Sequence, residues 1–230
     1  MPGAEPRPAM ELVRHPAPGG GAARTLLVML PGVGFAAADF AAHGFVAAAQ
    51  AAASLDIVAA RPDLDLYLDQ TIAAEIERTI VAPARAAGAA RIWFLGISLG
   101  GMGALLHARA YPGGADGLIL LSPFLGTPGL IAEAAAAGGL AAWQPGAIAA
   151  NDGERQALAW LKHLVAAPLP RPELYLGYGR TDRFSRGHAL LAEVLSPERV
   201  VLGEGGHDWE TWGLLWRRIL ALRPFAPGGG

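Results

Sequence analysis

Short apolar runs alternate along this chain with longer stretches of helical composition. The runs are apolar at successive positions, which is typical of strands covered on both faces, as in a parallel sheet between helical layers. The stretches between them carry apolar residues closer to helical spacing. The pattern therefore favours the α/β class, with a mainly parallel central sheet and helices on both faces. Strands are expected at 26–30, 56–60, 92–95, 117–122, 174–179 and 199–203.

The remaining pattern predicts the helices and the domain limits. Pro83 is expected to kink or end the second helix early. One interruption between strands, about 124–170, has helical pieces but no obvious strand, and it predicts a small helical lid. The pattern thus predicts a flexible N-terminal segment (1–22), one domain (23–223) and a flexible tail (224–230). Helices are expected at 36–54, 69–87, 99–111, 184–195 and 209–222.

The sequence Gly96-Ile-Ser-Leu-Gly100 lies between a predicted strand and a predicted helix. This G-x-S-x-G spacing, in that setting, is the pattern of a nucleophile elbow. A serine in such a strained turn needs glycines two residues away on each side, because a side chain there would collide. The pattern indicates Ser98 as a nucleophile. The alternative is a glycine-rich turn in which Ser98 only caps the helix.

Two further polar residues follow later predicted strands. Asp182 comes after the strand at 174–179, and His207 lies in a glycine-rich loop after the strand at 199–203. Reactive groups gather at the carboxyl ends of parallel strands, so we expect Ser98, Asp182 and His207 to meet. His207 would take the serine proton, and Asp182 would orient the imidazole. For Asp182 the alternative is a turn residue that caps the next helix.

The sequence Leu30-Pro-Gly-Val-Gly-Phe35 follows the first buried strand. A turn there can aim a backbone N–H at a developing oxyanion. The expected donors are the amides of Val33 and Leu99, the residue after the nucleophile. The sequence does not specify which amide of residues 32–35 donates. The alternative interpretation of this segment is an ordinary strand-to-helix turn.

Between residues 26 and 222 the chain resembles the α/β-hydrolase superfamily. The resemblance lies in Pro31-Gly-Val-Gly34, the G-x-S-x-G motif, Gly179-Arg-Thr-Asp182 and Gly205-Gly-His207. It implies an eight-stranded sheet pattern trimmed at its amino end, and it assigns the three catalytic roles to the same residues. Pro31 stands where a histidine often precedes the oxyanion glycine, so a lipase-type oxyanion loop does not transfer directly.

These features predict a serine hydrolase that cleaves a carboxylic ester through an acyl-enzyme intermediate. A thioesterase or acyltransferase for acyl carriers is the first alternative, because Arg180, Arg183 and Arg186 could form a basic rim for an acidic carrier. A catalytically silent scaffold of the same fold is the second alternative. An apolar acyl or alcohol group would suit an aromatic pocket, for which we expect Phe35, Trp143 and Trp209, although these rings could simply pack.

Composition limits the other possibilities. The net charge of −2 and the 17% of charged residues give no electrostatic footprint for nucleic acid. The absence of cysteine excludes disulfides and thiolate metal sites. No nucleotide fingerprint or metal-ligand cluster is apparent, so no cofactor and no metal is expected. The partner is a small-molecule ester or acyl substrate, with no membrane segment and no secretory signal, which leaves a cytoplasmic location as the default and the oligomeric state open.

Overall fold

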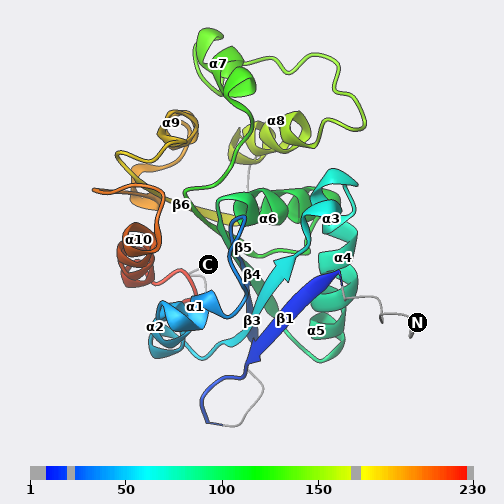
Figure 1. The fold of residues 1–230 in the computed structure, drawn as a ribbon, viewed down its shortest axis with the longest axis vertical. Helices are drawn as coiled ribbons and strands as arrows, with labels where there is room; N and C mark the ends of the chain where they lie inside the picture. The colour runs from blue at the N-terminus through cyan, green and yellow to red at the C-terminus, as the bar shows by residue number, and fades with distance from the viewer. Residues whose placement is uncertain (1–8, 20–23, 167–171, 227–230) are drawn as a thin grey trace, which may run out of the picture.

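A computed structural model describes residues 9–19, 24–166 and 172–226. In these ranges the chain forms a seven-stranded sheet with the order β1-β3-β2-β4-β5-β6-β7 (Figure 1). Only β1 runs antiparallel to its neighbour, so the sheet is mainly parallel as predicted. The strands are β1 (Met10–His15), β2 (Thr25–Leu30), β3 (Asp56–Pro62), β4 (Arg91–Ile97), β5 (Gly117–Leu121), β6 (Glu173–Gly179) and β7 (Val200–Gly203).

Helices cover both faces of the sheet, with α1, α2 and α10 on one side and α4, α5 and α6 on the other (Figure 1). The helices α8 and α9 pack with α6 into the core on its side of the sheet. Within the described ranges, no helix is long and apolar enough to cross a membrane. The helices are α1 (Asp39–Ala42), α2 (Phe45–Ala52), α3 (Leu64–Leu68), α4 (Ile72–Ile76), α5 (Ala82–Ala86), α6 (Leu99–Ala110), α7 (Pro128–Ala136), α8 (Gly153–Ala166), α9 (Ser185–Ala192) and α10 (Trp209–Ala221), with a π-helical turn at Glu77–Val81 and a 3-10 turn at Pro197–Arg199.

The central strands send alternate side chains into two separate cores. Val28 and Phe94 pack under the α6 face, whereas their chain neighbours Met29 and Leu95 pack under the α10 face. All four side chains are buried. Because both faces are covered, no polar position interrupts these strands, which is why the sequence shows them as continuous apolar runs.

Two predicted helices are interrupted. The stretch 36–54 forms α1 and α2, because Gly44 between them has a left-handed φ of 76°. The stretch 69–87 forms α4, a π-helical turn and α5. Pro83 does not end this segment, which contradicts one of the two outcomes expected there. It lies in the first turn of α5, and in the wider turn before it Ala82 donates its N–H to the Glu77 carbonyl. A proline is tolerated in such a first turn.

The prediction of a flexible segment over 1–22 is wrong for Met10–His15, which form β1. This edge strand pairs with β3 in a register that aligns Leu12 with Ala60. Met10 and Leu12 pack against the core on the α6 side of the sheet, and Val13 packs against the core on the α10 side. This short apolar pattern lies between proline-rich and glycine-rich sequences, which hid it. Residues 1–8 and 20–22 of the predicted segment lie outside the described residues.

The end of the chain also differs from the flexible tail predicted for 224–230. The Phe225 ring is buried and packs edge-on against Trp93, with ring centroids 5.2 Å apart. The Arg91 guanidinium donates to the carbonyls of Phe225 and Ala226, at 2.5 and 3.0 Å. Residues 224–226 are therefore part of the packed domain, and residues 227–230 lie outside the described ones.

The predicted lid, about 124–170, contains α7 and α8 and, as predicted, no strand among its described residues. Helix α8 buries Leu158 and Leu161 in the core beside α6. It is therefore part of the helical layer that covers the sheet. Helix α7 follows the carboxyl end of β5 and projects from the body of the molecule (Figure 1). The lid prediction for residues 167–170 lies outside the described residues.

Candidate active site

Ser98 lies at the sharp junction between β4 and α6. Its backbone has φ 52° and ψ −118°, a conformation that non-glycine residues rarely adopt. The flanking glycines make this junction possible. A Cβ on Gly96 would lie 2.5 Å from the Gly101 Cα, and a Cβ on Gly100 would collide with the carbonyl of Leu30 on β2. The spacing of the motif thus follows from how closely α6 approaches the sheet.

The structure brings Ser98, His207 and Asp182 together, as expected from their places after β4, β7 and β6. The Ser98 Oγ lies 3.0 Å from the His207 Nε2. The His207 Nδ1 lies 2.8 Å from the Asp182 Oδ2. A carboxylate only accepts, so the Nδ1–H donates to Asp182 and the Nε2 is left to accept the serine proton. This arrangement can deprotonate the hydroxyl as it attacks an electrophile.

Asp182 is almost fully buried, and its position is fixed by several donors. The Phe184 N–H donates to its Oδ1 at 2.8 Å. Burial raises the pKa of this carboxyl, but the hydrogen bonds from His207 and from the Phe184 N–H, together with the nearby Ser122 hydroxyl, outweigh burial and leave the pKa below its usual value. Asp182 therefore keeps its negative charge beside the imidazole. The bond to the Phe184 N–H, two residues later, is a turn contact. Asp182 does not cap α9, whose N-cap residue is Phe184 and which has no side-chain cap, so only the turn part of the alternative role is confirmed.

Aromatic rings enclose the His207 imidazole on two sides. The rings of Phe184 and Trp212 lie nearly perpendicular to it, with centroids 5.2 and 5.0 Å away. Trp212 is fully buried, whereas His207 keeps part of its surface open. The rings restrict the imidazole to a plane in which it reaches both Asp182 and Ser98.

The glycine-rich loop after β2 lies directly beside the nucleophile. A Cβ on Gly32 would lie 3.1 Å from the Ser98 Cβ, and Gly34 has a left-handed φ of 85°. The loop is held from behind, because the Ala36 N–H donates to the Asp39 carboxylate at 2.8 Å. The N–H groups of Val33 and Leu99 make no hydrogen bond within the described part of the chain. Both are available to an oxyanion.

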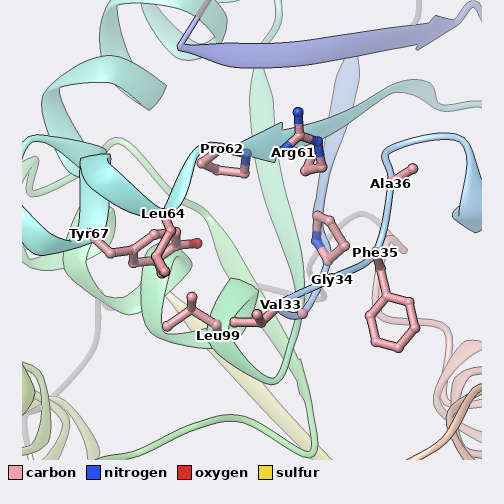
Figure 2. Close-up of a pocket in the computed structure, with 11 residues that line it drawn as sticks. Val33, Gly34, Phe35, Ala36, Arg61, Pro62, Leu64, Tyr67 and Leu99 are labelled. Atoms are coloured by element: carbon pink, nitrogen blue, oxygen red, sulfur yellow. The ribbon is translucent and has the colours of Figure 1, made fainter.

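Two adjoining cavities open beside this loop. One, of about 310 Å³, is lined by Ser98 and His207. The other, of about 380 Å³, extends toward Arg61, Pro62 and Tyr67; Figure 2 shows Leu64 and Tyr67 on the opposite side from the loop. The residues that line both cavities are Gly32, Val33, Phe35, Leu64 and Leu99.

Of the three predicted substrate contacts, the structure supports the position of one. Phe35 lines both cavities, but Trp143 and Trp209 line neither of them. Trp143 is buried beside α7 and α8, where its Nε1–H donates to Glu133 at 2.8 Å. Trp209 stacks on the His43 ring, with centroids 4.3 Å apart. The predictions for these two tryptophans are corrected, since both rings are used in packing.

Two residues at the cavities, Leu64 and Phe184, were not predicted from the sequence, and Arg183 was expected only as part of a basic rim for an acidic carrier. Leu64 lies just after the carboxyl end of β3, and Arg183 and Phe184 directly follow Asp182. The usable signal was position, because loops at the carboxyl ends of parallel strands share one edge of the sheet.

A second histidine lies close to Asp182 and was not singled out either. His188 on α9 is completely buried, and its Nε2–H donates to the Pro123 carbonyl at 2.9 Å. Burial lowers the pKa of this imidazole to about 4, against a weaker upward effect of Asp182. His188 is therefore neutral near pH 7. It connects α9 to the loop whose Phe124 N–H donates to the Ser98 carbonyl at 2.9 Å.

Comparison in sequence identifies no protein family model and no curated protein that matches this chain. Comparison in structure finds many similar proteins. They include the substrate-bound serine hydrolase FphF of Staphylococcus aureus, with a TM-score of 0.64, 14% identity and coverage of 94% of this chain and 98% of that one. Est1E of Butyrivibrio proteoclasticus gives 0.64, 15% identity and 95% of each chain. A monoacylglycerol lipase of Paleococcus ferrophilus gives 0.59, 17% identity, and 94% of this chain and 99% of that one.

The similarity extends over nearly the whole length of both partners, and the seven-stranded sheet with helices on both faces agrees with it. At this level of sequence identity the comparison shows the fold alone. This chain therefore has the α/β-hydrolase fold.

Proposed function

We propose that this protein is a serine hydrolase that cleaves carboxylic esters through an acyl-enzyme intermediate. The observation that carries the proposal is the unbroken chain of hydrogen bonds from the strained Ser98 through His207 to the buried Asp182. The hydroxyl at its end faces an open cavity, where a substrate carbonyl can reach it. Similar structures include proteins named as a serine hydrolase, a lipase and an esterase, which agrees with this chemistry.

In the proposed mechanism the Ser98 Oγ attacks the ester carbonyl while the His207 Nε2 takes its proton. The Asp182 carboxylate stabilises the imidazolium that forms. The N–H groups of Val33 and Leu99 donate to the oxyanion of the tetrahedral intermediate, and each such donor typically lowers the barrier by about 3–4 kcal/mol. Collapse of this intermediate breaks the C–O bond, and His207 gives the proton to the leaving alcohol. Water then repeats the sequence on the acyl-enzyme.

The substrate lies, in this proposal, across the two cavities beside the loop. Their shared lining is mostly apolar, with Phe35, Leu64 and Leu99 prominent. Arg61 at the far end already forms ion pairs with Glu11 and Asp63, at 3.0 and 3.1 Å. An apolar acyl or alcohol group therefore suits this space.

Covalent labelling tests the proposed nucleophile. A fluorophosphonate probe should add one adduct to the protein, as read by intact mass, and Ser98→Ala should abolish it. Ser54→Ala, which changes an exposed serine far from the site in sequence, serves as the control and should keep the adduct. An adduct that persists in Ser98→Ala would show that another residue is the nucleophile.

Turnover of p-nitrophenyl esters tests the base. His207→Ala should lower kcat by roughly 10⁴-fold or more, because the members of such a unit act together, while circular dichroism stays native. The same assay with acyl thioesters compares turnover of esters and thioesters, and so distinguishes an esterase from the thioesterase alternative. Ester turnover near the wild-type rate in His207→Ala would refute the role given to the imidazole.

A further inference from the structure

Two arginines lie next to the cavity of the proposed nucleophile. Arg183 lines the cavity that contains Ser98 and His207, and it also lines a smaller cavity of about 150 Å³ on the α7 side. Arg186, three residues later in the first turn of α9, lines the smaller cavity too. The rest of that cavity is mainly apolar, with Pro123, Leu125, Pro128 and Ile131 in its wall.

Neither arginine forms an ion pair with any residue that the structure describes. Arg180, in the same loop, differs, because it pairs with Glu204 at 3.0 Å. One carboxylate lies close to Gly126, which lines the smaller cavity. It belongs to Glu154, which accepts the Thr127 N–H at 2.7 Å and is not paired with either arginine.

The position of Arg183 and Arg186 at the start of α9 is electrostatically unfavourable for the folded protein. Arg183 lies just before α9 and Arg186 in its first turn, which has no acidic side chain of its own. The carboxylate of the preceding Asp182 is already engaged by His207 and the Phe184 N–H. The N-terminal end of a helix carries partial positive charge, so a cation there is unfavourable and an anion favourable. Two unpaired cations at this position, on the wall of a cavity, are therefore well placed to meet an anionic ligand.

The Arg183 guanidinium is also held near the reacting groups. It lies over the Phe184 ring, 5.0 Å from the centroid, and the same ring lies nearly perpendicular to the His207 imidazole, with centroids 5.2 Å apart. A cation over an aromatic face is attracted to it, which limits the positions that the long side chain takes. An anion bound here would lie beside the ester that Ser98 attacks.

We propose that Arg183, assisted by Arg186, binds a carboxylate of the substrate and makes this protein prefer esters that carry a negative charge. The planar guanidinium matches a carboxylate, to which it can donate two parallel hydrogen bonds. The charged end of the substrate lies toward the smaller cavity and its ester at Ser98. This inference rests on the proposed ester hydrolysis and names the class of substrate for the same site.

The test compares esters matched in length but different in charge. One pair carries the charge on the acyl side, the p-nitrophenyl monoester of adipic acid against p-nitrophenyl hexanoate. The other carries it on the alcohol side, p-carboxyphenyl hexanoate against its carboxamide. In one of the two pairs, the wild type should show a higher kcat/KM for the charged ester than for its neutral partner. Arg183→Gln should lower that value about tenfold and leave the neutral partner within about twofold, since a tenfold change corresponds to about 1.4 kcal/mol.

Arg180→Gln is the matched control, because it removes a nearby charge that already has a partner. It should leave both members of each pair unchanged. Arg183→Glu should make the neutral ester the better substrate. The charge preference should also weaken as salt increases, because the arginines are exposed.

Equal effects of Arg183→Gln on charged and neutral esters, or no effect on either, would overturn the inference while the proposed ester hydrolysis stands. Loss of all ester turnover in the wild type would instead count against the proposed function. In that case the charge preference is measured by comparing the rates at which carboxylate-bearing and neutral fluorophosphonates label Ser98. Labelling rates independent of probe charge and of Arg183 would overturn the inference.

Discussion

Ser98 keeps its strained backbone because β5, the loop after β5 and the first turn of α6 hold it by hydrogen bonds. Its N–H donates to the Leu121 carbonyl at 3.1 Å, and its carbonyl accepts the N–H groups of Gly101 and Phe124 at 3.0 and 2.9 Å. Such conformations typically cost of order 1–3 kcal/mol and persist only where the surroundings fix them. These hydrogen bonds fix the backbone that presents the hydroxyl to the cavity.

A single residue, His188, makes the stability of the folded protein depend on pH. Its pKa of about 4 in the folded protein lies below the usual 6.5. Between these values the unfolded chain binds a proton that the folded protein does not, so stability is full above about pH 6.5 and falls as the pH drops toward 4. The loss amounts to about 3 kcal/mol. Urea unfolding at pH 7 and pH 4 should show it.

The variant His188→Gln isolates this contribution. Its amide can still donate to the Pro123 carbonyl but does not titrate, so its stability should fall less between the two pH values. Asp182 and His107 also have lowered pKa values, and both groups are present in the wild type and in His188→Gln. An identical pH dependence of the two proteins would contradict the neutral state given to His188.

At the scale of elements, the close approach of α6 to β2 and β4 decides how the site is built. The helix begins directly after Ser98, so its first N–H groups lie at the carboxyl end of the sheet. The approach is possible only with glycine at positions 96 and 100, where any Cβ would meet backbone atoms of the neighbouring segments. Backbone cannot swing aside as a flexible side chain can.

We expect Gly100→Ala to destabilise the protein by about 3 kcal/mol or more, because its Cβ would overlap the Leu30 carbonyl on β2. The control is Gly129→Ala in α7, where a Cβ meets nothing within 4 Å. Alanine favours helix over glycine by about 1 kcal/mol at most, so this variant should equal or slightly exceed the wild type. Urea unfolding measures both. Equal stability of the two variants would contradict the packing argument.

At the scale of the molecule, one sheet separates two cores, and the cavities lie at its carboxyl edge. The face covered by α1, α2 and α10 is closed by Phe225 near the end of the chain. The edge beyond β3 is covered by β1 from near its beginning. Segments close to both ends of the described chain thus complete a domain in which Ser98, Asp182 and His207 come from the middle and later parts.

Phe225→Ala tests whether the end of the chain is structural. We expect a loss of about 3 kcal/mol, because the ring is buried between Trp93 and Trp216. Leu222→Ala, which removes a side chain that is 44% exposed, should cost less than about 1 kcal/mol. Thermal or urea unfolding separates the two. Ester turnover per folded molecule should stay the same in both variants.

The sequence determined the parts of this protein that depend on local signals. The buried strands were readable because both faces of the sheet are covered, and the junction at Ser98 was readable because its glycines are needed for backbone reasons alone. The order of Ser98, Asp182 and His207 along the chain then predicted their meeting, since parallel strands end at one edge. The structure brings the three side chains within hydrogen-bonding distance.

Only the tertiary structure decided the features that depend on what lies across a face or a loop. It made Met10–His15 an edge strand, buried Phe225, and directed Trp143 and Trp209 into packing instead of the cavities. It also placed Arg183 and Leu64 on the cavity walls. A side chain's partners in these cases come from distant segments, so neither its type nor its neighbours in sequence specify whether it packs or faces a ligand.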